Sequence, residues 1–148
     1  QSKQTRVCIL RTGIVLSKKG GMLSQMLLPF SLGLGSVFGR GNQYISWIHI
    51  RDMVAGIIFL LNSSEAGGVF NLTAPYPETN RIFSKKLALT MSRPCAFRLP
   101  ELILKPILGE MSTMVLDGQR VFPEKLLKSG FRFQFNTLEE ALTDIIKD

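Results

Sequence analysis

The sequence predicts an α/β fold with a mostly helical tail. Three runs of strand-forming residues, at 6–16, 43–50 and 68–75, alternate with stretches in which apolar residues recur at helical spacing. Strands separated by helices are typical of a sheet whose successive strands run parallel. A length of 148 residues is that of a single domain.

The first run, RVCILRTGIVL at 6–16, is almost wholly apolar and is therefore predicted to be a parallel strand buried on both faces. A helical pattern at 22–27 follows, and Pro29 is expected to end that helix. In the run at 43–50, strand alternation divides the side chains between two faces. One face is expected to hold Ile45, Trp47 and His49, and the other Tyr44, Ser46, Ile48 and Ile50.

Further helices are predicted from the spacing of apolar residues. The stretch 51–62 places five of them on one side, namely Met53, Val54, Ile57, Ile58 and Leu61. Asn80 is a candidate N-cap for a helix that buries Phe83 and Leu87, and the chain from Leu99 onward reads as mainly helical. Thr137 and Glu140 have the spacing of a capping box at the start of the last helix.

Four glycines at Gly33, Gly35, Gly39 and Gly41 raise the question of a dinucleotide fingerprint. Such a fingerprint joins a buried strand to a helix whose N-terminal amides meet the pyrophosphate. Here the glycines follow a helix, the spacing to Gly39 is one residue too long, and a strand comes next. A connecting loop with some positive φ angles is the favoured interpretation.

Ser46, His49 and Asp52 suggest a hydrolase triad, but Ser46 and His49 would face opposite sides of a strand and no GxSxG motif is present. For His49 a structural role is favoured over a functional one. Arg11 lies within an apolar strand, so it needs either a carboxylate of the fold or a ligand, and both remain open. One His, two separated cysteines and no carboxylate cluster disfavour a metal site.

Composition narrows the class of protein. The formal charge of +7 favours anionic partners, yet the basic residues are scattered and no aromatic-interleaved stripe typical of nucleic-acid binding occurs. No apolar run is long enough to span a membrane, and the N-terminus lacks the features of a signal peptide. A cytoplasmic protein that binds neither nucleic acid nor membrane is expected.

The order of several motifs resembles the C-terminal half of an extended short-chain dehydrogenase/reductase, an epimerase-like family with a Rossmann-like fold. The segments that carry the resemblance are LRTGIVL, GRGNQYISWIHIRDMVAGIIFLL and GVFNLTAP, followed by GQRVFPEKLLKSGFRF. They are similar to epimerase-like proteins that end in a conserved domain of unknown function, some of which carry the label cell division inhibitor SulA. The resemblance divides the chain into a substrate-side part at 1–98 and a helical, family-specific tail at 99–148.

The resemblance implies an NAD(P)-dependent oxidoreductase or epimerase whose glycine fingerprint and catalytic Tyr segment lie upstream. It implies that the chain is a fragment, inactive and without cofactor when isolated, and it assigns no catalytic residue or metal ligand here. The segment expected beside the nicotinamide is Arg11, Thr12, Gly13, Ile14 and Val15. The residues expected to line or support the substrate pocket are Ser46, Trp47, His49, Asp52, Gln119 and Arg120.

The resemblance also has a departure. Nucleotide-sugar epimerases usually have an Arg at the position of Ile45, and an isoleucine offers neither charge nor hydrogen bond to a diphosphate. A smaller or less anionic substrate is therefore expected. The expected partners are this substrate and the missing nucleotide-binding half, and a homodimer stays open. The alternative function is a non-catalytic interaction module, as the cell-division label suggests, which would need an exposed contiguous apolar face.

Overall fold

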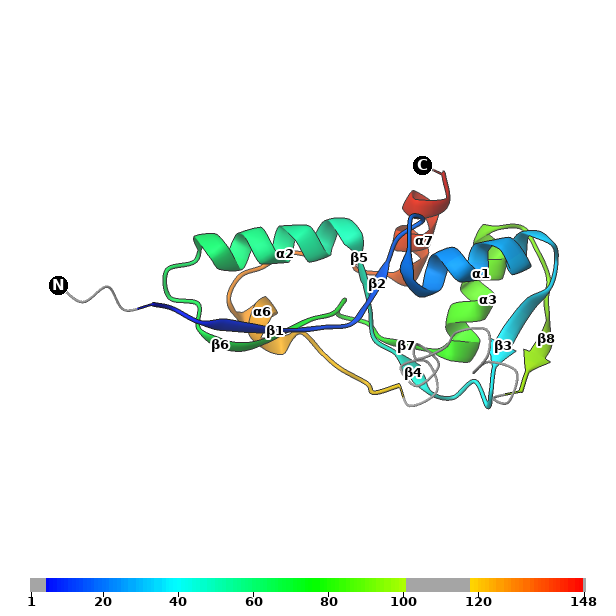
Figure 1. Ribbon diagram of the computed structural model, residues 1–148, viewed down its shortest axis with the longest axis horizontal. Coiled ribbons are helices and arrows are strands. Elements are labelled where there is room, and N and C mark those ends of the chain that lie inside the picture. Colours follow the sequence, from blue (N-terminus) through cyan, green and yellow to red (C-terminus); the bar gives the residue numbers. More distant parts are fainter. Residues whose placement is uncertain (1–4, 101–117, 148) are drawn as a thin grey trace.

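The computed structural model describes residues 5–100 and 118–147 and confirms the predicted α/β class. The molecule is elongated, with α2, β1, β6 and α6 toward one end and α1, α3, β3 and β8 toward the other (Figure 1). The strands are β1 Cys8–Thr12, β2 Ile14–Leu16, β3 Gly35–Phe38, β4 Tyr44–Ile45, β5 Trp47–His49, β6 Gly68–Leu72, β7 Glu78–Thr79 and β8 Cys95–Leu99. The helices are α1 Gly21–Ser31, α2 Ile50–Asn62, α3 Asn80–Thr90, α6 Glu124–Lys128 and α7 Leu138–Lys147.

The strands pair mostly in parallel, as the alternation of strands and helices predicts. β1 pairs with β6, β2 with β5 and β3 with β8, all in parallel, whereas β4 and β7 are antiparallel. The predicted strand at 6–16 is therefore divided between β1 and β2, and the one at 43–50 between β4 and β5.

The chain changes its strand partner at Gly13. β1 runs beside β6 up to Thr12, the Gly13 N–H donates to the carbonyl of Leu72, and the Ile14 N–H donates to the carbonyl of Ser46 at the start of the β2–β5 pairing. A Cβ on Gly13 would lie 2.4 Å from the Ser46 carbonyl oxygen. Glycine is required here because two backbones meet, and the result is a fork between the ends of β6 and β5.

Two hydrophobic clusters form the interior. The first core lies under α1, α3 and α7 and includes Trp47, Phe83 and Leu87. The second core lies between β6, α2 and α6. Its buried members are Ile48, Leu60, Ala66, Phe70, Leu72, Leu126, Phe131 and Phe133.

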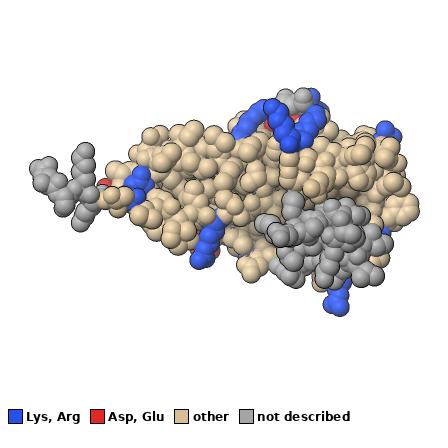
Figure 2. Space-filling view, in the orientation of Figure 1, with Lys and Arg blue, Asp and Glu red and all other residues tan. Residues whose placement is uncertain are grey.

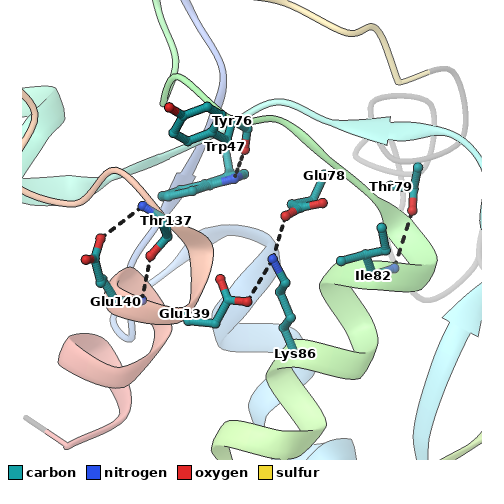
Figure 3. Close-up of polar contacts among 9 residues, drawn as sticks. All are labelled: Trp47, Tyr76, Glu78, Thr79, Ile82, Lys86, Thr137, Glu139 and Glu140. Carbon is teal, nitrogen blue, oxygen red and sulfur yellow. Dashed lines mark hydrogen bonds and ion pairs between the residues drawn. The ribbon is translucent and has the colours of Figure 1, made fainter.

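The tail is tied to the rest of the chain by buried polar contacts. Asp52 in the first turn of α2 accepts hydrogen bonds from the backbone N–H groups of Gln134 (2.8 Å) and Phe135 (3.0 Å). Thr137 and Glu140 form the predicted capping box at α7, in which the Glu140 side chain accepts from the Thr137 N–H at 3.0 Å (Figure 3). These hydrogen bonds hold the pKa of Glu140 below its ordinary value.

An ion-pair group joins three elements beside the capping box. Lys86 on α3 lies 2.5 Å from Glu78 on β7 and 2.9 Å from Glu139 on α7 (Figure 3). The two carboxylates outweigh the cost of partial burial and raise the pKa of Lys86. Nearby, the Trp47 indole N–H donates to the Tyr76 carbonyl. The tail therefore packs against the strand and helix segments that precede it.

Several expectations about local structure are wrong. The glycine-rich stretch is not all loop, because Gly35–Phe38 forms the buried strand β3, which pairs with β8, a strand that was not predicted from the sequence. Gly33, Gly39 and Gly41 do have positive φ angles. Helix α1 continues past Pro29 to Ser31.

Two surfaces expected to be buried are exposed. Ile9 on β1 is 53% exposed, and β1 has no second strand partner among the described residues. On α2 the buried positions are Asp52, Gly56 and Leu60, while Val54, Ile58 and Leu61 are 49%, 52% and 70% exposed. We call these last three residues the α2 stripe. The spacing of apolar residues predicted the position of the helix correctly, but it did not predict which face of the helix is buried.

Candidate functional site

A polar pocket opens at the fork of the sheet, where β1 and β6 end and β2 and β5 begin. Its volume is about 710 Å³, within the range of small-molecule sites. The carboxyl ends of parallel strands are the usual ligand position in open α/β sheets. The described residues that line it are Arg11, Thr12, Gly13, Ile14, Tyr44, Ser46, Val69, Asn71, Thr73, Gly118, Gln119, Arg120, Val121, Phe122, Glu124 and Lys125.

One wall of the pocket is formed by the tail segment 118–122, which we call the strap. The Ser46 hydroxyl donates to the Gln119 carbonyl at 2.7 Å and accepts from the Val121 N–H at 3.0 Å. Asn71 on β6 donates from Nδ2 to the Phe122 carbonyl at 3.1 Å. Side chains at the ends of the strands therefore replace the backbone pairing that a neighbouring strand would give the strap.

Three cations line the pocket. The guanidinium carbon of Arg120 lies 5.1 Å from the ring centre of Tyr44 and 5.0 Å from that of Phe122, which is cation–π geometry. Lys125 lies 4.3 Å from the centre of the Phe70 ring and donates to the Gly67 carbonyl. Arg11 projects from β1, in register with Asn71 of β6.

The structure brings most of the sequence-predicted site residues to this pocket. In the segment predicted to face the nicotinamide, Arg11, Thr12, Gly13 and Ile14 line it, and Val15 packs against the second core. Ser46, Gln119 and Arg120 also line it. Ser46 reaches the pocket as an anchor of the strap, since its hydroxyl is already engaged there.

Three other predicted pocket residues lie elsewhere. Trp47 is fully buried in the first core with Ile45, on the opposite face of the strand from Tyr44 and Ser46. Trp47 therefore does not line the pocket beside Ser46, since neighbouring residues of a strand point to opposite faces. The place of Ile45 in the core also means that this side chain does not border the pocket.

His49 and Asp52 belong to the joint between α2 and the tail. His49 caps α2, with Nδ1 accepting from the Arg51 N–H at 3.1 Å, and its ring stacks on Phe135 at 3.9 Å between centres. Nε2 lies 3.2 Å from a carboxylate oxygen of Asp144. Burial lowers the pKa of His49 despite the two nearby carboxylates of Asp144 and Asp52. Neither residue lines the pocket, and their contacts fit the structural role that the sequence favours for His49.

The expectations from sequence missed several pocket residues: Tyr44, Val69, Asn71, Thr73, Phe122 and Lys125. Asn71 and Thr73 had a usable signal, because they are polar residues spaced by two at the carboxyl end of a predicted parallel strand. Phe122 and Lys125 had none, since their positions depend on where the strap lies.

Other kinds of site have no geometric support in the described part of the chain. Residues 5–100 and 118–147 contain no group of three or more His, Cys, Asp or Glu side chains that could hold a metal ion. Both cysteines are free. The face shown in Figure 2 carries its Lys and Arg side chains in separate groups, not in a continuous stripe. No described helix is long and apolar enough to cross a membrane.

The described residues could accommodate only the nicotinamide end of a dinucleotide cofactor. The polar pocket has room for a nicotinamide beside Arg11–Ile14. The glycine-rich stretch leads through β3 into β4 instead of into a helix, so in the described residues it forms no pyrophosphate turn. The chain can therefore supply a wall for one end of such a cofactor and not the cradle for its phosphates.

The parallel strands, the covering helices and the pocket at the strand ends define a Rossmann-like α/β fold, similar to that of solved epimerase-type structures. Comparison with known families agrees. Residues 1–73 match the model of the NAD dependent epimerase/dehydratase family, and residues 99–145 match that of a domain of unknown function, DUF1731.

The relatives carry the same family name. An epimerase family protein of Staphylococcus epidermidis is 48% identical over 143 residues, which are 97% of this chain and 48% of that protein. One of Staphylococcus aureus is 47% identical over 144 residues, again 48% of its length. The chain thus spans about half the length of the curated relatives it matches. These names give the cell-division label no support.

Solved structures agree with the fold. Human epimerase family protein SDR39U1 (isoform 2), solved with NADPH, superposes with a TM-score of 0.92 at 35% identity, over 97% of this chain and 49% of that one. A nucleoside-diphosphate sugar epimerase of Corynebacterium glutamicum gives 0.72 at 26% identity, over 95% of this chain and 26% of the other.

Proposed function

We propose that this chain forms the substrate-side wall of an NAD(P)-dependent epimerase or oxidoreductase. In this proposal Arg11, Thr12, Gly13 and Ile14 border the nicotinamide, and the strap closes the pocket over a small-molecule substrate. The cofactor would supply hydride transfer, while these residues bind and orient what reacts with it. No acid or base is assigned to this chain.

The position of the pocket carries the proposal. It lies where β1 leaves β6 for β5, and such a change of partner at the carboxyl ends of parallel strands creates the crevice that α/β enzymes use. The human neighbour that superposes on the chain was solved with NADPH, which supports a nicotinamide cofactor.

The exposed apolar surfaces support a further layer of protein beside this one. Parallel sheets are normally covered on both faces, yet β1 has a free edge in the described part and the α2 stripe is open. The relatives are about twice as long as this chain. We therefore propose that a nucleotide-binding half packs here in the complete protein and that the isolated chain is inactive.

The test is a titration of the complete protein, as its gene encodes it, with NADPH and NADH. Nicotinamide fluorescence and the thermal midpoint should both respond to at least one of them. The variant Gly13→Val, which drives side-chain atoms into the Ser46 carbonyl, should lose the response, while Gly67→Ala, whose added Cβ meets nothing within 4 Å, should keep it. A complete protein that binds neither nucleotide would end the proposal.

The isolated chain gives a second test. Because its described residues form no pyrophosphate turn, we expect no dinucleotide binding at micromolar concentration in a calorimeter. Micromolar binding of NADPH by the isolated chain would contradict the proposal that the cofactor's phosphates are bound by a part of the protein outside this chain.

The interaction module remains a second candidate, since the α2 stripe is the kind of exposed apolar surface that it requires. Hydrogen exchange of α2 separates the two functions. If the amides of α2 exchange much more slowly in the complete protein than in the isolated chain, the stripe is covered within the protein and the interaction module loses its surface. Equal exchange together with a reproducible partner in a pull-down would favour the module.

A further inference from the structure

The pocket is positively charged. Among its described lining residues Arg11, Arg120 and Lys125 are cationic and only Glu124 is anionic. A concave site with an excess of one sign concentrates ligands of the other sign. Lys125 already donates to the Gly67 carbonyl, so it adds charge to the site, whereas the two arginines are the candidates for direct contact.

Arg120 packs against two aromatic rings and forms no ion pair with a described carboxylate. Its guanidinium lies over the rings of Tyr44 and Phe122. Aromatic rings interact with the flat face of a guanidinium, and its N–H donors lie in the plane of the group. These donors remain for a ligand in the pocket.

The backbone on both sides of Arg120 is fixed. The hydroxyl of Ser46 bonds to the residue before it and to the residue after it, at Gln119 and Val121. Asn71 fixes the carbonyl of Phe122. Because the backbone on both sides is held and the guanidinium packs against two rings, Arg120 loses less conformational freedom when it binds a partner.

Arg11 provides the second cation from a different wall. It lies on β1 opposite Asn71 of β6, and paired residues of neighbouring strands project toward the same side of a sheet. Arg11 likewise makes no ion pair with a described carboxylate. The sequence left open whether Arg11 meets a carboxylate of the fold or a ligand, and the pocket favours the ligand.

We infer that the pocket binds a small organic anion, a molecule with a carboxylate or a phosphate group that Arg120 contacts through its N–H edge and Arg11 contacts from β1. This inference rests on the proposed function and names the substrate class of the same site. Planar guanidinium donors match both anionic groups with paired hydrogen bonds, which a neutral alcohol or amide cannot accept equally well.

Matched pairs of probes test the inference by NMR titration of the complete protein, with and without saturating NADPH. The pairs are benzoate with benzamide and glycerol 3-phosphate with glycerol. At least one anion should bind about tenfold more tightly than its neutral counterpart, because hydrogen bonds to charged groups are the stronger ones. Arg120→Gln should remove about tenfold of the anion's affinity and leave the neutral probe unchanged, and Arg120→Lys should lose less.

Arg93→Gln is the matched control, since Arg93 is exposed after α3 and does not line the pocket. The inference is overturned if each anion binds no better than its neutral partner, or if the two glutamine variants act alike. It is also overturned if Arg120→Gln weakens NADPH and spares the anions, because the guanidinium would then serve the cofactor's phosphates. If the unaltered protein does not bind NADPH, the proposed function fails, and this outcome is distinct from failure of the anion-binding inference.

Discussion

The two hydrophobic cores of this chain are built from similar residues but are covered to different extents. In the first core three helices, α1, α3 and α7, lie around the buried residues, and Trp47, Phe83 and Leu87 are fully buried. In the second core α2 and α6 cover β6, while Ile9, Val54, Ile58 and Leu61 remain exposed. The first core is closed by the described residues themselves, and the second leaves an apolar side open.

The difference shows which apolar surface the described residues leave uncovered. Apolar area that stays in water gains nothing on folding, so the second core contributes less stability for its size. The pocket lies at the fork where the strands of the two ends meet, and the strap crosses it. The closed core thus supports one side of the site, and the open core is where we propose that a nucleotide-binding half packs.

The largest expected effect separates the two cores directly. Leu87→Ala on α3 removes a fully buried side chain and should lower the free energy of unfolding by about 3 kcal/mol. Leu61→Ala on α2 makes the same change at a side chain that is 70% exposed and should cost less than about 0.5 kcal/mol. Urea denaturation of the isolated chain measures both. Similar costs would show that the α2 stripe is already covered, for instance by a second copy.

The second effect tests the connection between the cores. Asp52 on α2 accepts from two backbone N–H groups of the tail, and Asp52→Ala leaves both unsatisfied, so we expect a loss of about 2 to 3 kcal/mol. Asp52→Asn keeps one acceptor oxygen and should lose about half as much. A substrate-binding role without a structural one would instead leave the urea midpoint of both variants unchanged.

The third effect concerns the strap. Ser46→Ala removes the hydroxyl that bonds to Gln119 and Val121, which should cost about 1 kcal/mol and loosen the segment. Trypsin should then cleave after Arg120 several times faster than in the unaltered chain. Ser63→Ala serves as the control, because the Ser63 hydroxyl, directly after α2, donates to the Phe59 carbonyl of that helix and not to the strap. Equal cleavage rates in the two variants would refute the anchoring role.

The smallest effect is a dependence on pH at the α2–tail joint. The pKa of His49 is lowered in the folded chain, so the unfolded chain binds more protons near the ordinary histidine pKa of about 6.5. Its contribution to stability is therefore complete above that pH and declines as the pH falls toward the lower folded pKa. Asp144, Asp52 and Arg51 are the charged groups that act on the His49 ring.

The variant His49→Asn isolates that contribution, because asparagine keeps an N-cap acceptor and does not titrate. The urea midpoint of the unaltered chain should fall between pH 7.5 and 5.5, and the fall should be shallower in the variant. Parallel curves would assign the acid sensitivity to other groups.

Much of the fold could be predicted from local sequence. The helix at α2, the strand at β6 and the capping box at Thr137 follow from apolar spacing and capping chemistry, which are properties of short segments. The strands β3 and β8 could not be predicted in this way, because each is stabilised by pairing with the other, about 60 residues away in the sequence. The division at residue 98 stays a prediction.

The candidate site shows the same limit. Arg11 and Gly13 could be singled out because a charged residue and a glycine are unusual inside an apolar strand. Arg120 could be singled out only through the family resemblance. Trp47, His49 and Asp52 also looked functional, yet the structure buries them in the core and at the α2–tail joint. Polarity and position near a predicted site do not distinguish a residue that supports the fold from one that meets a ligand.

The sequence by itself determined the α/β class, most of the helices, the resemblance to the epimerase-like family and the choice of the segment around Gly13 as a candidate site, because these follow from periodicity and motifs along the chain. Only the tertiary structure decided which face of α2 is open, that the strap crosses the fork, and that Arg120 reaches the pocket between Tyr44 and Phe122. The physical reason is that burial and pocket shape depend on contacts between segments far apart in sequence, and the pattern within one segment does not specify its neighbours.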